Sequence, residues 1–320
     1  MNFTLLGCGR WGSFIAWYLD KNNNDVTVWG REGDPIVENL VKTRKNEYVE
    51  FPESIEITND LEYALAKSEY VIISIGAQAV RNLMERVSAI EEYKKKKFIL
   101  CMKGIEDNTG NRLSQVLIEF GVDPANIAVW VGPGHIQSFV QGIPSVMIID
   151  SYNPELSAFL ANYLRTDLIR FYQGNDIVGS EIGAAAKNVM GIAAGLLDGM
   201  GYTALKGGLM ARGTREVARL IKACGGNELS AYGLCHLGDY EATLFSQFSH
   251  NRMWGETFAK NEPFTKLAEG VATSSAMLTL AEQVNVELPI TQTVYDVING
   301  IITKPEAIKR LMTRENTKEF

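Results

Sequence analysis

Seven short apolar runs within the first 173 residues restrict the fold of this chain more than any other feature. They read FTLLG, VTVWG, YVIISIG, FILCMKG, IAVWVG, SVMIID and LIRFY. Segments with the apolar spacing of helices lie between several of them, among them residues 11–21, 60–67 and 112–120. Short apolar runs that alternate with helices are typical of parallel strands buried on both faces of a sheet. We therefore expect an α/β domain with a mostly parallel sheet.

The pattern changes after about residue 175, because no further strand-like run occurs. Helical spacing continues over residues 177–197, 209–224, 272–283 and 305–312. Pro289 is expected to open one more helix, since proline is tolerated in the first turn. The sequence thus predicts a sheet domain over residues 1–178 and an all-helical domain over residues 179–320.

Three glycines follow the first apolar run directly. Gly7, Gly9 and Gly12 have the G-x-G-x-x-G spacing, and a helical segment begins after them. The first glycine of such a loop permits a tight turn, the second lets a pyrophosphate approach the backbone, and the third lets the helix pack closely. The free N–H groups of the helix N-terminus then face the anion. This context predicts a Rossmann-type dinucleotide-binding domain.

The residue after the second strand bears on the choice of nucleotide. An acidic residue at that place holds the ribose diol of NAD, but here Gly30 and Arg31 follow VTVW. A guanidinium has no acceptor for a hydroxyl group and suits a 2′-phosphate. We therefore favour NADP, or use of both NADP and NAD. The alternative is that Arg31 stacks on the adenine and tolerates either cofactor.

One lysine, Lys187, interrupts the apolar helical stretch of residues 181–200. Helical spacing places small residues such as Gly183 and Gly191 on its side of the helix. A buried ammonium is costly unless a partner pairs with it or a reaction uses it. Small neighbours let a ligand approach, but tight helix packing or extension of the lysine to the surface explains the same pattern.

Further polar residues occupy places where ligands are expected. Lys103 follows one strand-like run, and Gly132, Gly134 and His135 follow the next, at strand ends where open α/β sheets bind ligands. We leave open whether His135 contacts a ligand or supports the backbone. A later polar cluster contains Asp239, Ser249, His250, Asn251 and Arg252. Such donors suit a small anionic substrate, for example a phosphate ester, whereas His236 is expected only to pack among the helices.

Charge and composition exclude several classes of partner. The 31 basic and 38 acidic residues give a net charge of -7, which argues against a surface for nucleic acid or anionic lipid. No run reaches the ~18 apolar residues that span a bilayer, and the N-terminus lacks the pattern of a signal peptide. The four cysteines and three histidines lack zinc-site spacing. We expect a cytoplasmic protein with reduced thiols, no metal and no membrane insertion.

The motifs together resemble the NAD(P)-dependent glycerol-3-phosphate dehydrogenases of the bacterial type over essentially the whole chain. The stretches that carry the resemblance are GCGRWG, VWGR, MKGIE, GPGH, AAAKNVMGIAAGLLDGMGY, ARGTREVARL, GLCHLGD, SHNRMWG, EGVATSSA and VELPIT. The resemblance implies reversible reduction of dihydroxyacetone phosphate to sn-glycerol 3-phosphate, which supplies the backbone of glycerophospholipids. The apolar helices of the second half also lead us to expect a homodimer.

The resemblance implies roles for individual residues. Lys187 matches the general acid/base, Lys103 a lysine that contacts the substrate region and the cofactor, and Asp239 an active-site aspartate. The implied substrate-binding residues are Lys103, Gly132, Gly134, Lys187, Asp239, Ser249, His250 and Asn251. The implied cofactor-binding residues are Gly7, Gly9, Arg10, Trp11, Gly12, Arg31, Lys103, Ile136, His250 and Glu269.

Two positions depart from the family pattern. Gly134 stands where serine or threonine is usual, and His250 stands where arginine is usual. Arginine is permanently charged whereas histidine is mostly neutral at pH 7, so both changes are expected to weaken phosphate binding. Arg252 is a candidate to replace the missing arginine. The departures leave two alternatives, a reductase of another small hydroxy or keto substrate and a non-catalytic nucleotide-binding sensor.

The implied chemistry is acid/base assistance to hydride transfer. As a carbonyl carbon accepts hydride, its oxygen becomes an alkoxide, which a nearby ammonium stabilises and protonates. Burial favours the neutral form of Lys187, whereas a neighbouring Asp239 favours the charged form. The sequence leaves open which of the two effects dominates.

Overall fold

The computed structural model describes residues 1–315, and the chain divides into two compact units. The first unit comprises Met1–Lys103 and Arg112–Glu181. The second comprises Gly104–Asn111 and the chain from Ile182 onward. The functional domain boundary expected after residue 178 stays a prediction.

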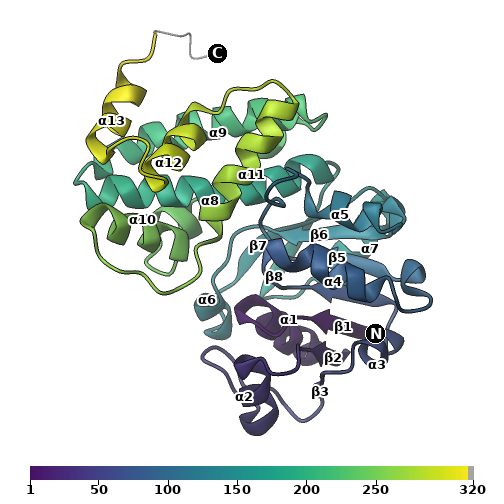
Figure 1. The fold of residues 1–320 in the computed structure, drawn as a ribbon. Coiled ribbons are helices and arrows are strands. Elements are labelled where there is room, and N and C mark those ends of the chain that lie inside the picture. The colour runs from purple at the N-terminus through teal and green to yellow at the C-terminus, as the bar shows by residue number, and fades with distance from the viewer. Residues whose placement is uncertain (316–320) are drawn as a thin grey trace. The chain divides into compact units, whose positions relative to one another are not determined.

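The described part of the first unit contains one sheet of eight strands (Figure 1). The strands are β1 (Asn2–Leu6), β2 (Asp25–Trp29), β3 (Glu56–Thr58), β4 (Tyr70–Ile73), β5 (Lys97–Leu100), β6 (Ile127–Val131), β7 (Ser145–Ser151) and β8 (Ile169–Gln173). Their order is β3-β2-β1-β4-β5-β6-β7-β8, and all neighbours are parallel except β6 and β7. The prediction of a mostly parallel sheet is confirmed.

Helices cover both faces of this sheet. They are α1 (Arg10–Lys21), α2 (Pro35–Thr43), α3 (Leu61–Ala66), α4 (Val80–Val87), α5 (Leu113–Glu119), α6 (Ile136–Val140) and α7 (Pro154–Tyr163). Successive strand residues alternate between two buried clusters: Leu5 belongs to the cluster with α1 and α7, and Leu6 to the cluster with α3, α4 and α5. This alternation explains why the central strands β1, β4, β5 and β6 are almost entirely apolar, since neither of their faces meets water.

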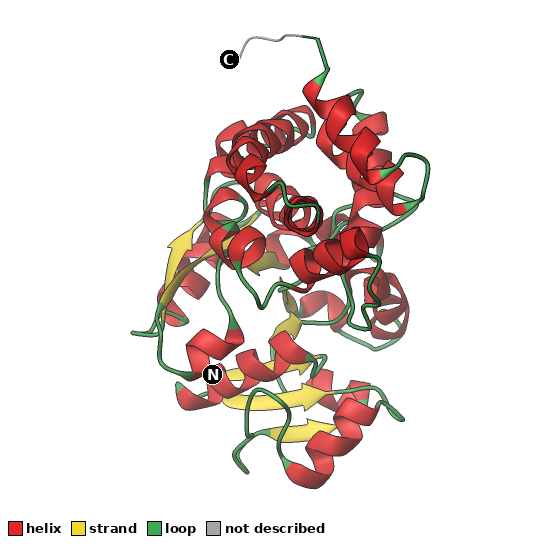
Figure 2. Cartoon of the chain, turned by 90° about the vertical axis from the view of Figure 1, so that its left-hand side faces the viewer, coloured by secondary structure: helices red, strands yellow, loops and turns green. Residues whose placement is uncertain are grey.

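The second unit is helical, and no strand follows β8 in the described chain (Figure 2). Its helices are α8 (Ile177–Gly199), which begins in the first unit, α9 (Lys206–Ala223), α10 (His250–Lys260), α11 (Glu269–Gln283), α12 (Pro289–Ile298) and α13 (Lys304–Met312). Three short turns separate α9 from α10: η5 (Glu228–Tyr232) and η6 (Leu237–Asp239) are 3₁₀ helices, and η7 (Glu241–Phe245) is a π-helical turn. Pro289 opens α12, as predicted. No described helix is long and apolar enough to cross a membrane.

Two buried glutamates cap the N-termini of other helices in their own unit. In the first unit, Glu181 accepts hydrogen bonds from the backbone N–H of Ser114 at 2.8 Å and from the guanidinium of Arg112 at 2.7 Å. In the second unit, Glu216 on α9 accepts from the backbone N–H groups of Ile290 at 2.7 Å and Thr291 at 3.0 Å. The first N–H groups of a helix have no partner within the helix, so these carboxylates fasten α5 to α8 and α12 to α9.

Replacing Glu216 with leucine is expected to lower the free energy of unfolding by at least about 3 kcal/mol, because three donors at the start of α12 lose their acceptor. Chemical denaturation measures the change. Glu282→Leu on the exposed face of α11 is the control, with a change within about 0.5 kcal/mol. Equal losses in the two variants would contradict the capping role.

Candidate active site

The glycine loop after β1 lies where the order of the strands reverses. β1 has β2 on one side and β4 on the other, and the chain passes through β2 and β3 before it returns to β4. Ligands of open α/β sheets bind at such a switch point, beyond the carboxyl ends of the strands. The loop is therefore placed where a nucleotide is expected.

Close packing requires two of the glycines in this loop. Gly7 has a φ of +111°, and a Cβ atom there would lie 2.4 Å from the carbonyl oxygen of Ser74. A Cβ atom on Gly12 would lie 2.2 Å from the carbonyl oxygen of Gly7. A larger residue at position 12 would push α1 away from the turn after β1, and one at position 7 would clash with the chain that follows β4.

The third glycine leaves the start of α1 open. Gly9 is the N-cap residue of α1 without a side-chain capping bond, and a Cβ atom on it would meet nothing within 4 Å. The backbone N–H groups of the first helical turn and the positive end of the helix dipole face this open space. The loop thus fits the pyrophosphate of a dinucleotide.

The remaining cofactor residues predicted in the first unit lie around this loop or after β2. Arg10 lies with its guanidinium 5.6 Å from the centre of the Tyr48 ring. Trp11 is half-buried beside Arg10, and Ile136 is buried at the start of α6. Arg31 is exposed two residues after β2. Contact of Arg31 with a 2′-phosphate and its stacking on adenine both stay predictions.

Lys103 and Gly132 come together at the carboxyl ends of two neighbouring parallel strands, β5 and β6. The Nζ atom of Lys103 donates a hydrogen bond to the carbonyl oxygen of Gly132 at 2.7 Å. This bond places the amine at the strand ends of the sheet.

The Phe139 ring explains why glycine occupies position 134. A Cβ atom on Gly134 would lie 2.4 Å and 2.5 Å from two carbon atoms of that ring. The ring cannot move away freely, because it stacks on Phe14 of α1 with 4.9 Å between the ring centres. An aromatic ring therefore occupies the space that a serine or threonine side chain would need.

Gly134→Ser is expected to cost about 1–3 kcal/mol of stability through overpacking against Phe139. In a double-mutant cycle, Phe139→Leu should relieve part of that cost and give a coupling energy of at least about 0.5 kcal/mol. Gly208→Ser on α9, where a Cβ atom meets nothing within 4 Å, is the control. Additive effects in thermal unfolding would show that the ring does not exclude a side chain.

The Lys187 ammonium is buried in the second unit. Its side chain on α8 is 11% exposed, and Nζ lies 3.1 Å from Oδ2 of Asp239 on η6. The same nitrogen donates a hydrogen bond to Oγ1 of Thr243 on η7 at 2.8 Å. The alternative that Lys187 extends to the surface is wrong, because the amine is fixed inside the unit by a carboxylate and a hydroxyl.

The small residues near Lys187 serve helix packing. A Cβ atom on Gly191 would lie 3.0 Å from Thr243 and 3.2 Å from Asn251, and one on Gly195 would lie 2.0 Å from the carbonyl oxygen of Arg252. The glycines of α8 therefore let other chain segments approach within backbone contact. That approach brings Thr243 within reach of the lysine.

The predicted polar residues of α10 join the same region. Asn251 donates from Nδ2 to Oδ1 of Asn188 at 3.0 Å and accepts from the backbone N–H of Gly270 at 2.9 Å. Ser249 is the N-cap of α10, and its hydroxyl accepts a hydrogen bond from the N–H of Arg252. The amide of Asn251 thus connects α8, α10 and the start of α11, where Glu269 is the first residue.

His250 is the first residue of α10, between Ser249 and Asn251. Its half-buried imidazole meets the ring of Phe264 edge-on, with 6.3 Å between the ring centres. A side chain at this position lies at the positive end of the helix dipole, where anions are favoured.

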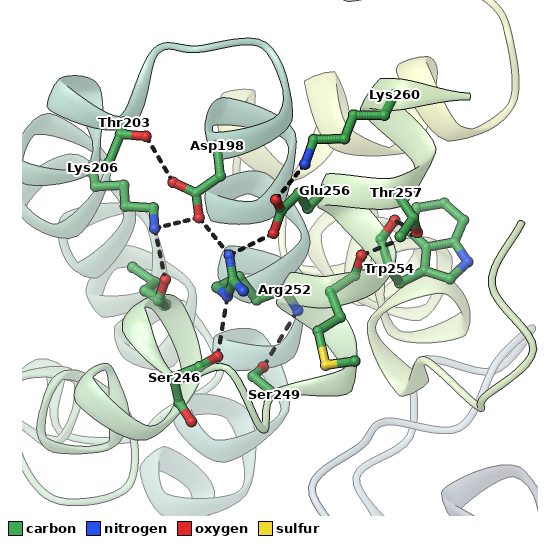
Figure 3. Close-up of polar contacts among 12 residues, drawn as sticks. Asp198, Thr203, Lys206, Ser246, Ser249, Arg252, Trp254, Glu256, Thr257 and Lys260 are labelled. Atoms are coloured by element: carbon green, nitrogen blue, oxygen red, sulfur yellow. Dashed lines mark hydrogen bonds and ion pairs between the residues drawn. The ribbon is translucent and has the colours of Figure 1, made fainter. Parts of the chain in front are cut away.

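An ion-pair network holds the start of α10 (Figure 3). The carboxylate of Asp198 accepts from Nζ of Lys206 at 2.5 Å and from Nη1 of Arg252 at 2.8 Å. Arg252 also donates to Glu256 and, through Nε, to the carbonyl oxygen of Ser246. Burial alone would raise the pKa of Asp198, but the hydrogen bonds from both cations lower it. The guanidinium of Arg252 thus donates through Nε and Nη1 to this network. Its suggested use in place of the arginine expected at position 250 stays a prediction.

Arg252→Met is expected to lower the free energy of unfolding by about 2 kcal/mol, because Asp198 and Glu256 each lose one of their two cationic partners and the carbonyl oxygen of Ser246 loses its donor. Lys260→Met is a matched control, since Lys260 pairs with the same Glu256 at an exposed position. Its expected effect is within about 0.5 kcal/mol. Denaturant titrations of both variants provide the comparison, and equal losses would rule out a special role for the buried guanidinium.

Thr243 contacts Lys187 although no signal in the sequence pointed to it, and Asn188, which the motif around Lys187 contains, has a partner that the motif does not show. Thr243 lies 56 residues from Lys187, in a turn without any periodic signal. Asn188 follows Lys187 directly, but its link to Asn251 depends on the packing of α8 against α10. Both contacts are products of tertiary structure.

An open glycine loop at the switch point of one unit, and a buried lysine–aspartate pair in the other, are features that fit a nucleotide-dependent dehydrogenase. Two family models, described as the N-terminus and C-terminus of NAD-dependent glycerol-3-phosphate dehydrogenase, match residues 2–157 and 176–309. The chain belongs to this family, and the resemblance inferred from its motifs is confirmed. It is an NAD(P)-dependent oxidoreductase.

Individual relatives match over their full length. The glycerol-3-phosphate dehydrogenase [NAD(P)+] of Prosthecochloris aestuarii is 34% identical over 100% of both chains. That of Thermoanaerobacter sp. is 32% identical over 100% of this chain and 99% of its own. The crystal structure of glycerol-3-phosphate dehydrogenase from Coxiella burnetii has a TM-score of 0.90 at 25% identity, covering 98% of this chain and 99% of that chain.

Proposed function

We propose that this chain catalyses the reversible NAD(P)H-dependent reduction of dihydroxyacetone phosphate to sn-glycerol 3-phosphate. Full-length similarity to glycerol-3-phosphate dehydrogenases supports the activity. The buried ammonium of Lys187, fixed by Asp239 and Thr243, is the structural observation that carries the proposal. The product is a precursor of glycerophospholipids.

Lys187 is the proposed general acid/base. Bound NADPH or NADH supplies the hydride that reduces the carbonyl carbon. The ammonium of Lys187 stabilises the negative charge that develops on the substrate oxygen and then donates its proton to it. Asp239 and Thr243 orient the amine through its other hydrogen bonds, so its position is set before the substrate arrives.

The proposed cofactor residues follow from the loop geometry and from the predicted motif matches. The backbone at Gly9 and the first turn of α1 would hold the pyrophosphate, with Gly7 and Gly12 giving the loop its shape. The remaining proposed contacts are Arg10, Trp11, Arg31, Lys103, Ile136, His250 and Glu269. The exposed guanidinium of Arg31 supports NADP or dual use.

The proposed substrate contacts are Lys103, Gly132, Gly134, Ser249, His250 and Asn251, together with the Lys187–Asp239 pair. Gly134 offers only its backbone, because the Phe139 ring takes the side-chain space. Because His250 stands where the resemblance implies arginine, the permanent positive charges of this proposed set are those of Lys103 and Lys187. We also propose a homodimer in the cytoplasm, on the basis of the apolar helices and the composition.

Lys187→Met is expected to lower kcat at least about 100-fold, since methionine fills the space without donating a proton. The assay follows NADPH and NADH absorbance with dihydroxyacetone phosphate. Lys222→Met, at an exposed position of α9, is the control and keeps wild-type turnover. Wild-type kcat in a folded Lys187→Met variant would overturn the proposed mechanism.

The same assay with unphosphorylated dihydroxyacetone separates the alternatives. Turnover that requires the phosphate supports glycerol-3-phosphate dehydrogenase activity. Equal turnover without the phosphate supports a reductase of another small carbonyl compound. Cofactor binding without turnover of any carbonyl compound supports a nucleotide sensor.

A further inference from the structure

A second polar pair, His236 and Tyr240, is buried next to the Lys187–Asp239 pair. These two residues flank η6, the 3₁₀ turn that ends in Asp239. His236 is 0% and Tyr240 1% exposed. The Nδ1 atom of His236 lies 2.8 Å from the carbonyl oxygen of Gly183 on α8, and Nε2 lies 2.7 Å from the hydroxyl of Tyr240.

Hydrogen-bond accounting assigns one tautomer to His236. A carbonyl oxygen only accepts, so Nδ1 carries the proton and donates it to Gly183. Thr214 is near the Tyr240 hydroxyl at 3.5 Å, but its own hydroxyl donates to the carbonyl oxygen of Met210 at 2.7 Å. The Tyr240 O–H therefore donates to Nε2 of His236, which accepts with its lone pair.

Burial keeps this imidazole neutral. Loss of hydration lowers the pKa of His236 to about 4, although the hydrogen bond to Gly183 and the charge of Asp239 act in the opposite direction. The charged groups that act on the ring are Asp239 and Lys187. A second cation here would compete with Lys187 for the carboxylate of Asp239, and the neutral ring avoids that competition.

The contact with Gly183 ties the aspartate to the helix that carries the lysine. Gly183 lies four residues, or about one turn, before Lys187 on α8. A Cβ atom on Gly183 would lie 2.9 Å from Sγ of Cys235 and 3.1 Å from Cβ of His236. Only glycine lets the chain before η6 approach α8 this closely.

Tyr240 holds Thr243, the second hydrogen-bond partner of Lys187. Its carbonyl oxygen accepts from the backbone N–H of Thr243 at 3.1 Å, at the start of η7. Its ring is fully buried, and a Cβ atom on Gly213 of α9 would lie 3.5 Å from its hydroxyl oxygen. The two residues thus fasten η6 to α8 and η7 to α9.

We propose that His236 and Tyr240 are positioning residues, which hold Asp239 and Thr243 against the ammonium of Lys187 through the bonds Tyr240 O–H to His236 and His236 N–H to Gly183. This assignment rests on the proposed function and replaces the expectation that His236 only packs. Neither side chain touches the reacting atoms; they act through Asp239 and Thr243.

Tyr240→Phe tests the role by removing one hydroxyl while the ring stays. The expected result is a fall in kcat of at least about tenfold, with the KM for NADPH changed less than about twofold, because the amine is displaced but the nucleotide site is not. Tyr232→Phe on η5, at an exposed position, is the matched control and keeps the wild-type kcat.

The pH profile separates positioning from mere stability. In Tyr240→Phe the lone pair of Nε2 loses its donor, so the pKa of His236 is expected to rise and the acid limb of the kcat profile to move to higher pH than in the wild type. The double variant His236→Asn/Tyr240→Phe should lack that shift. A Tyr240→Phe variant with lowered thermal stability but wild-type kcat at every pH would overturn the proposal.

NMR of the wild-type protein tests the tautomer assigned to His236 without relying on a variant that must fold. With ¹⁵N-labelled histidine, the imidazole of His236 should show protonated Nδ1 and unprotonated Nε2 down to about pH 5. A signal that titrates near pH 6.5, or one with Nε2 protonated, would overturn the assignment. An inactive wild-type enzyme would instead contradict the proposed function and leave this NMR result standing.

Discussion

One buried ion pair, between Lys187 on α8 and Asp239 on η6, underlies the proposed site of the helical unit. An unpaired buried ammonium costs several kcal/mol, so Lys187 needs a carboxylate and further acceptors at fixed positions. Asp239 and Thr243 supply them from two short turns between α9 and α10. The turns η6 and η7 must themselves stay in place, and the hydrogen bonds of His236 and Tyr240 hold them. The stability of this part of the molecule and the proposed chemistry therefore depend on the same contacts.

Glycine has the same physical use in both units. Gly12 lets α1 pack on the turn after β1, and Gly195 lets α10 approach the backbone of α8. In each case a Cβ atom would come within 2.2 Å of a carbonyl oxygen. At position 134 the neighbour is an aromatic side chain instead of a backbone carbonyl, and the Phe139 ring excludes any side chain there. The glycine at position 134 thus has a packing cause in this chain.

The sequence predicted the strands and helices better than it predicted which side chains contact one another. All seven apolar runs form strands, whereas β3 was missed because its three residues, EIT, are only half-buried and form no apolar run. The glycine loop was predictable because Gly7, Gly9 and Gly12 have a recognisable spacing directly after an apolar run. The contacts of Arg252 were not, since its bonds to Asp198 and Ser246 depend on how α8 and α10 pack. The same holds for His236, whose neutral state follows from its complete burial.

The amino-acid sequence by itself determined the strands, most of the helices, the sharp turn at Gly7 and the presence of an isolated lysine in an apolar helix. These features follow from backbone sterics and apolar periodicity, which act over a few neighbouring residues. Only the tertiary structure decided that the lysine pairs with Asp239 and Thr243, and that Phe139 excludes a side chain at position 134. A buried charge finds its partners among segments far along the chain, and their packing, not local preference, sets those distances.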